Sequence, residues 1–146
     1  MSKITWYVKE NESFLPKEEY HAGTFRKNED IVFNVQVWNN RWGVSDETAI
    51  QNPVVSFSFG HYEDTSLFEV CEVVENDRNS LPVIAKEGKA SVLLTNSLSG
   101  KANDGSDAGA SNRENFIDIR FTFKTKGIEL KENDLKRIYF NINELT

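Results

Sequence analysis

Apolar and polar residues alternate with a period of two along five segments of the chain, as they do in half-buried β-strands. The alternating segments are residues 4–8, 31–38, 53–59, 116–124 and 138–143. In the second segment Phe33 and Val35 share one face, whereas the same alternation turns Trp38 toward the other. Each segment therefore predicts one strand with a single side facing the core.

Two further strands are predicted at residues 66–74 and 90–95, where the pattern is less regular. The first places Glu72 on the same face as apolar residues, so its register stays open. The second is apolar on both faces, as a central strand of a sandwich is. The best helical candidate is a single turn at residues 133–136. About seven to nine strands without crossover helices predict an all-β fold, a single antiparallel β-sandwich of immunoglobulin-like or jelly-roll type spanning residues 1–146.

Three long polar connections separate these strands, at residues 10–29, 39–52 and 97–115. The last holds three glycines and one large apolar residue, Leu98. Irregular connections of this length in a small domain are usually functional or mobile, so we predict a long mobile loop there. We expect residues 10–29 to wrap an edge of the sheets, and residues 1–9 to close an edge in the same protomer or in a neighbouring one.

Composition narrows the range of partners. The chain has 146 residues, with 17 basic and 23 acidic side chains for a net charge of −6, which disfavours nucleic acid as a partner. No segment approaches the ~20 apolar residues of a membrane helix, so no membrane insertion is expected. The N-terminal segment lacks the basic start and apolar run of a secretory signal, which predicts synthesis in the cytosol.

The residues that usually carry catalysis are scarce. There are two histidines, His21 and His61, and a single cysteine, Cys71, in the middle of a predicted strand. No nucleophile, phosphate-binding or metalloprotease motif is present, so we predict that the protein is not an enzyme and uses no cofactor. The acidic loop at residues 103–107 has Ala108 where a calcium ligand belongs and no closing glutamate, so no metal site is predicted there.

The strongest candidates for partner binding lie at two predicted loops, and they are Trp38, Arg41, Trp42, His61 and Tyr62. Exposed tryptophan beside arginine is typical of protein interfaces. A flat ring beside polar side chains equally suits stacking on a sugar. In a third interpretation the loop folds back, and both tryptophans pack beneath it for structural reasons.

The charges divide unevenly along the chain. Residues 42–77 contain eight acidic and no basic residues, whereas residues 120–137 contain six basic and three acidic ones. Opposed acidic and basic faces would let copies of the chain associate head to tail. The alternative is that the two regions form neighbouring strands whose charges pair across one sheet.

Residues 28–40 form an acidic turn followed by an alternating strand that ends on asparagine, and residues 49–57 begin a second strand. This arrangement resembles immunoglobulin-like modules of bacterial surface and adhesion proteins. Those modules are exported and repeated, whereas this chain has one copy and no signal. Single modules of this architecture without signals also resemble components of phage virions.

The resemblance and the composition together predict a non-enzymatic structural or assembly module. The favoured setting is a phage virion component, such as a head decoration, neck or tail accessory, with the virion as its location. Its partner would be a protein, with copies of the same chain among the candidates. The alternative is an adhesion module that binds carbohydrate or a host surface, in which case a glycan is the partner.

Overall fold

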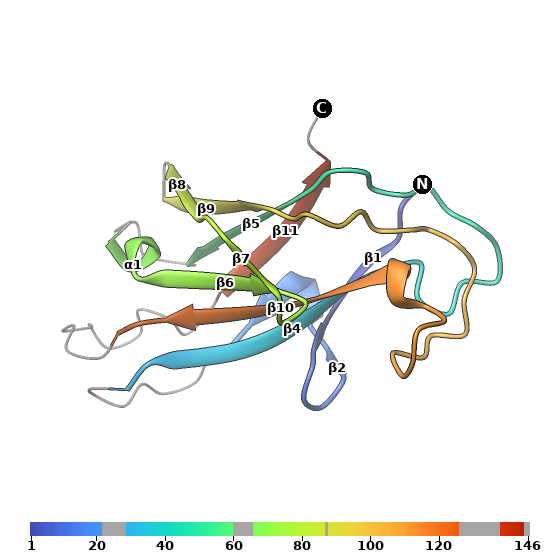
Figure 1. Cartoon of the computed structure of the whole chain (residues 1–146), viewed down its shortest axis with the longest axis horizontal. Coiled ribbons are helices and arrows are strands. Elements are labelled where there is room, and N and C mark those ends of the chain that lie inside the picture. The colour runs from blue at the N-terminus through green and yellow to red at the C-terminus, as the bar shows by residue number, and fades with distance from the viewer. Residues whose placement is uncertain (22–28, 60–65, 87, 126–137, 145–146) are drawn as a thin grey trace.

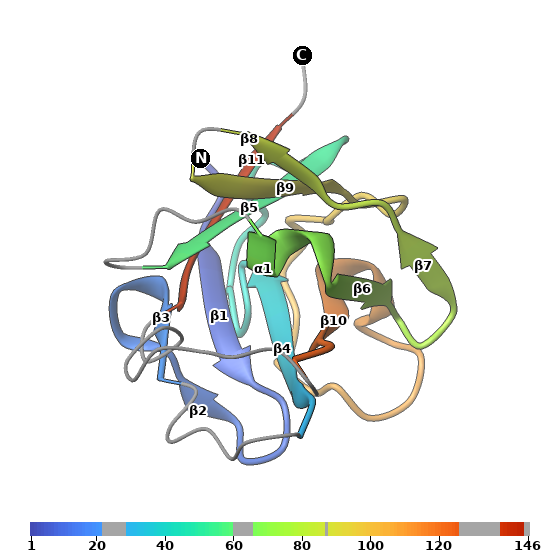
Figure 2. The same cartoon turned by 90° about the vertical axis from the view of Figure 1, so that its left-hand side faces the viewer.

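The computed structural model describes residues 1–21, 29–59, 66–86, 88–125 and 138–144, which form two antiparallel β-sheets packed face to face (Figures 1 and 2). The six-stranded sheet has the spatial order β2 (Ser13–Phe14), β1 (Ile4–Val8), β4 (Ile31–Asn39), β10 (Phe116–Phe123), β6 (Cys71–Glu75) and β7 (Asn79–Leu81). The five-stranded sheet has the order β3 (Glu19–Tyr20), β11 (Ile138–Glu144), β5 (Pro53–Phe59), β9 (Lys89–Leu93) and β8 (Ile84–Lys86). Short helical turns are η1 (Pro16–Glu18), α1 (Ser66–Glu69) and η2 (Arg113–Asn115). The all-β sandwich predicted from the sequence is confirmed; the described strands exceed the expected number because several have only two or three residues.

The core lies between the sheets and consists of the alternate residues that the period of two marks. Phe33 and Val35 of β4 are buried, as predicted. Phe121 of β10 stacks on Phe33 with a ring-centroid distance of 5.2 Å, and it meets Phe57 of the opposite sheet edge-on at 5.1 Å. These aromatic contacts across the sandwich join the two sheets without a disulfide.

The segment at residues 66–74 differs from its prediction in two respects. Its first four residues form the helical turn α1 instead of a strand. In β6, Cys71, Val73 and Glu75 face the core, whereas Glu72 is exposed. A carboxylate occupies a core position because hydrogen-bond donors surround it there.

The N-terminal part of the chain borders both sheets. β1 pairs with β4 on one side and with β2 on the other, so residues 1–9 pair within their own protomer and β2 forms the edge. β3 forms an edge of the second sheet, and residues 13–20 therefore run from one sheet edge to another, as expected for a wrapping segment. The helical turn expected at residues 133–136 lies outside the described residues. No helix among the described residues is long and apolar enough to cross a membrane.

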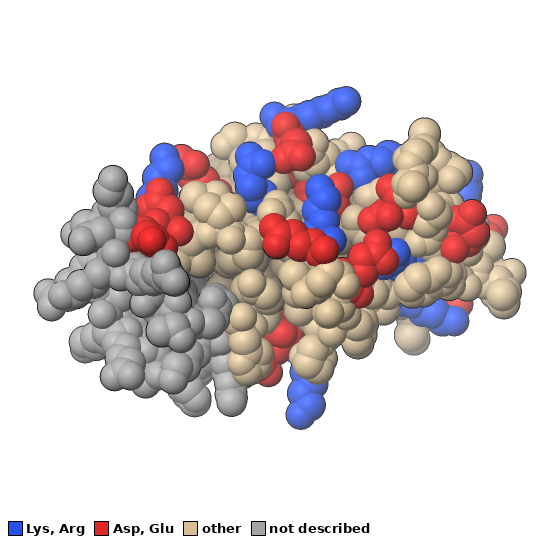
Figure 3. Space-filling model, turned by 90° about the horizontal axis from the view of Figure 1, so that it is seen from below, with Lys and Arg blue, Asp and Glu red and all other residues tan. Residues whose placement is uncertain are grey.

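The uneven charges of the sequence meet across the six-stranded sheet. Lys124, next to β10, pairs with Glu72 of β6 at 2.7 Å, and Arg120 pairs with Asp77 at 2.6 Å. Acidic and basic side chains are interspersed over the described part of the face in Figure 3. The two described basic residues of the 120–137 segment, Arg120 and Lys124, therefore both pair with acidic residues of the 42–77 segment; the basic residues at 126–137 lie outside the described residues.

The thiol of Cys71 provides a test of the β6 register. The residue is buried, and burial together with the Glu72 carboxylate raises the pKa of the thiol from 9.0 to about 12. Only the thiolate attacks a disulfide reagent, so we expect the native protein to react about 10³-fold more slowly at neutral pH than the protein unfolded in urea. With an aromatic disulfide as the reagent, the absorbance of the aromatic thiol that it releases measures both rates. The Cys71→Ala variant serves as the blank. Equal rates in the two states would place Cys71 on the outer face.

Candidate binding site at the loop end of the sandwich

Two long connections lie against each other at one end of the sandwich, and we call residues 39–52 and 97–115 together the paired loops (Figure 1). Ile50 and Leu98 exchange two backbone hydrogen bonds of 2.9 Å. The amide of Glu47 also donates to the carbonyl of Gly100 at 2.7 Å. The segment at 97–115 thus makes defined contacts with its neighbour. Its mobility remains a prediction, which amide hydrogen exchange would measure.

Asparagine side chains supply many of the hydrogen bonds that hold the paired loops. The asparagines involved are Asn39, Asn40, Asn103, Asn112 and Asn115. The amide of Asn40 donates to the carbonyls of Ser45 and Gly100 at 2.8 and 2.9 Å. That of Asn115 donates to Ser99 and Lys101 at 3.0 and 2.9 Å. Backbone carbonyls that no strand pairs are satisfied in this way.

Arg41 lies at the centre of an aromatic cluster formed where the paired loops meet the outer face of the six-stranded sheet. Its side chain is only 3% exposed. The guanidinium carbon lies 4.5 Å from the ring centroids of Tyr7 and Trp38 and 4.2 Å from that of Trp42. Each ring face attracts the cation, and the attraction strengthens where water is excluded.

Two polar contacts fix the orientation of the Arg41 guanidinium. Its Nε donates to the carbonyl of Gly105 at 3.0 Å, and its Nη2 lies 3.3 Å from a carboxylate oxygen of Glu12. The Nη1 atom is buried without a hydrogen-bond partner among the described residues. Arg41 is therefore held between the rings and does not face solvent.

Trp38 is also buried, on the outer side of its sheet. Its ring is fully covered and stacks on Phe116 at 4.5 Å. Its indole nitrogen donates to the side-chain oxygen of Gln36 at 2.5 Å. The alternation that turned Trp38 away from the core holds, but Arg41 and Phe116 cover it, so Trp38 presents no surface to a partner.

Trp42, in contrast, is 56% exposed. Its backbone has a φ of 60°, in the left-handed region that costs a side-chain-bearing residue about 1 kcal/mol. The side chain of Asn103 accepts a hydrogen bond of 3.1 Å from the Trp42 amide. The indole packs edge-on against Tyr7 at 6.3 Å and lies over Arg41. Trp42 is thus an exposed ring on a fixed support.

Phe14 of β2 extends the exposed aromatic surface. It is 56% exposed and meets Tyr7 edge-on at 5.7 Å. We call Tyr7, Phe14, Arg41 and Trp42 the aromatic platform. Sequence analysis missed Tyr7 and Phe14, although the alternation in residues 4–8 turns Tyr7 away from the core. His61 and Tyr62, the other two predicted partner-binding residues, lie outside the described residues.

In the acidic loop at residues 103–107, side-chain oxygens of Asn103 and Asp104 accept hydrogen bonds from the protein itself. The Asn103 side chain accepts from the amides of Trp42 and Gly105. Asp104 accepts from the side chain of Asn112 at 2.5 Å, and this bond holds the pKa of Asp104 below its usual value. No cluster of three or more histidine, cysteine or carboxylate side chains that could hold a metal occurs among the described residues.

Comparisons with known proteins do not indicate a function for this site. No protein-family model matches the sequence, and a search of curated proteins finds no match.

A substitution at Gly105 tests whether the position of Trp42 depends on close packing against this residue. Its φ of +77° favours glycine, and a methyl group there would overlap the indole of Trp42. Gly109 has a φ of +73° but open space around it, so Gly109→Ala carries the backbone cost without the overlap. We expect Gly105→Ala to lower the free energy of unfolding by about 2 kcal/mol more than Gly109→Ala. Urea denaturation measures both variants, and equal losses would contradict the packing of Trp42 on Gly105.

Proposed function

We propose that this protein is a non-enzymatic assembly module that associates with copies of itself through the aromatic platform. The observation that carries the proposal is Trp42, a ring that is more than half exposed yet held from beneath by Arg41 and Gly105. Tryptophan, tyrosine and arginine dominate the binding energy of protein interfaces. An exposed aromatic residue with this much support suits a contact better than it suits solvent.

The fixed support matters because ordering a side chain on binding opposes association. Arg41 contacts the underside of Trp42, so the indole is held before a partner arrives. Arg41 acts as a support and not as a contact, because its own side chain is buried. Of the candidates that sequence analysis named and the structure describes, Trp42 is therefore the one that meets a partner.

We further propose a phage virion as the setting, in which the module is a head decoration, neck or tail accessory. The resemblance of residues 28–40 and 49–57 to immunoglobulin-like modules supports this setting, and the sandwich architecture is compatible with it. An architecture hosts many functions, so the surface around Trp42 bears more of the argument than the fold does.

Adhesion to a carbohydrate or a host surface is the second candidate for the same platform. The exposed face of Trp42 favours it, since a flat ring also stacks on a sugar. Of the other residues that suggested it, Trp38 is buried and Tyr62 lies outside the described residues.

Molar mass measured by light scattering behind a sizing column tests self-association over a hundredfold range of concentration. We expect the parent protein to gain mass with concentration and Trp42→Ala to need at least about tenfold more protein for the same mass. Ile84→Ala is the matched control, because Ile84 is 65% exposed on β8, in the other sheet.

The dependence of self-association on salt concentration distinguishes a contact through the platform from pairing of opposite charges between chains. Asp77 and Glu72 already pair with Arg120 and Lys124 within one chain, so association through Trp42 should change little between low and high salt. A parent protein that stays monomeric throughout, or a Trp42→Ala variant that assembles like the parent, would contradict the proposed contact.

A further inference from the structure

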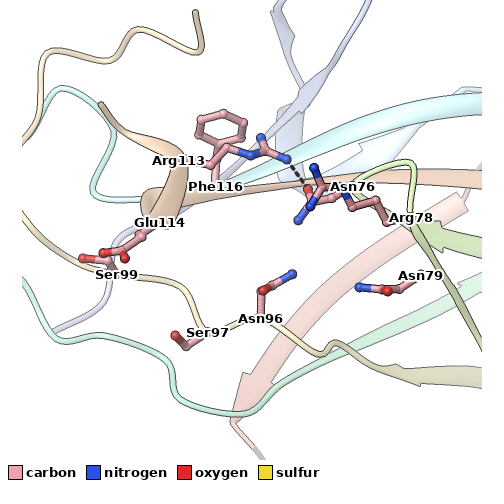
Figure 4. A pocket seen from close by; sticks show the side chains of 9 residues that line it. All are labelled: Asn76, Arg78, Asn79, Asn96, Ser97, Ser99, Arg113, Glu114 and Phe116. Atoms are coloured by element: carbon pink, nitrogen blue, oxygen red, sulfur yellow. Dashed lines mark hydrogen bonds between the residues drawn. The ribbon is translucent and has the colours of Figure 1, made fainter. Parts of the chain in front are cut away.

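A hollow of about 680 Å³ opens between the β6–β7 turn, the connection after β9 and η2 (Figure 4). Its lining is polar apart from one phenylalanine: Asn76, Arg78, Asn79, Asn96, Ser97, Ser99, Arg113, Glu114 and Phe116. The volume lies in the range of small-molecule sites, roughly 300–1,000 Å³. Trp42 does not line the hollow. A ligand of the hollow is therefore independent of the self-association proposed for Trp42.

Glu75 fixes two of the polar groups from below. Its side chain is fully buried. The carboxylate accepts hydrogen bonds from the amide nitrogens of Asn79 and Asn96 at 3.1 and 3.0 Å and from the backbone amide of Thr95 at 2.8 Å. Because both side-chain nitrogens point to Glu75, the amide oxygens of Asn79 and Asn96 accept no hydrogen bond from the described residues and can accept one from a ligand.

Other groups of the lining have no partner among the described residues. The hydroxyl of Ser97, the guanidinium of Arg78 and the carboxylate of Glu114 form no hydrogen bond or ion pair there. Arg113, in contrast, is held by the side-chain oxygen of Asn76 at 2.6 Å and by Asp118 at 3.3 Å (Figure 4). The hollow thus offers fixed acceptors together with donors of both neutral and charged kinds.

The hydrogen-bond donors, acceptors and charges that line the hollow indicate which class of ligand fits it. An apolar ligand would strip water from the polar lining and replace none of its hydrogen bonds. An anion would meet Arg78 and Arg113, but Glu114 on the rim and Glu75 beneath cancel their charge. A ligand rich in hydroxyl groups both donates and accepts at each position, and it carries no charge.

We infer that the hollow is a binding site for a neutral saccharide, with Glu75 as a positioning residue that orients the amides of Asn79 and Asn96. Phe116 is almost completely buried beneath Arg113, so it offers little surface for a sugar ring to stack on. Without stacking, we expect a Kd on the order of 1 mM for a single sugar ring.

The ¹⁵N-labelled full chain titrated with glucose and, separately, with N-acetylglucosamine tests the inference by NMR. The titrations run to about tenfold above the expected Kd. We expect one of these sugars to shift the backbone amides of residues 76–79 and 96–99 and the side-chain amides of Asn79 and Asn96 in a saturable manner. Inorganic phosphate and glucuronate, titrated in parallel, report any preference for anions.

Three variants test whether those shifts come from the hollow. Ser97→Phe fills it, and Ser97 makes no hydrogen bond among the described residues, so the fold should tolerate the change. We expect at least about a tenfold loss of affinity, because the ring occupies the volume of the ligand. Ser80→Phe, at an exposed position of β7 outside the hollow, is the control and should bind as the parent does. Arg78→Ala, which removes a donor without adding bulk, should weaken binding to a smaller degree.

Each other result would overturn the inference. Shifts caused by phosphate or glucuronate but by neither neutral sugar would make the hollow an anion site. Sugar-induced shifts that persist in Ser97→Phe, or that Ser80→Phe abolishes equally, would place the sugar elsewhere. The absence of any saturable shift with either neutral sugar would show that the hollow does not bind saccharides.

Discussion

Backbone carbonyls in the paired loops need hydrogen-bond donors that no neighbouring strand provides, and this constraint underlies the whole loop end of the sandwich. An unpaired buried carbonyl costs about as much free energy as a lost hydrogen bond. Asparagine amides meet the need, because one short side chain carries two donors and reaches two carbonyls, as Asn40 and Asn115 do. The carbonyl of Gly105, the one that orients Arg41, lies within the structure built in this way.

Arg41 links the hydrogen-bonded loops to the exposed ring of Trp42. Removing a guanidinium from water costs several kcal/mol, and ring faces, one carbonyl and one carboxylate offset that cost here. Since Trp42 covers one side of the cation, the energy that keeps Arg41 buried also keeps Trp42 in place. The left-handed backbone of Trp42 persists for the same reason, because the surrounding contacts outweigh its strain.

Local pattern predicted the long strands and pointed to Arg41 and Trp42, but it did not show which candidate side chains are buried, and β4 and β6 show why. Alternation places Phe33 in the core and Trp38 opposite it, since each side chain follows from the pleat of one strand. That Trp38 is buried depends on Arg41 and Phe116, and Phe116 belongs to the neighbouring strand β10, which lies far away in the sequence. The sequence leaves the register of β6 open because one choice places Glu72 on the same face as apolar residues. Glu75 faces inward because Thr95 and Asn96, about twenty residues away, donate to it. Partners so distant in sequence leave no local signal.

Phe116 and Arg113 line the polar hollow, and Phe116 also contacts Trp38, which packs against Arg41 of the aromatic platform. The ring of Phe116 stacks on Trp38 at 4.5 Å, and the guanidinium of Arg113 lies over the same ring at 4.6 Å. Arg113 also bonds to Asp118, whose second oxygen accepts from Gln36, the partner of Trp38. Contiguous contacts therefore lead from Arg113 at the hollow through Asp118 and Gln36 to Trp38, against which Arg41 packs.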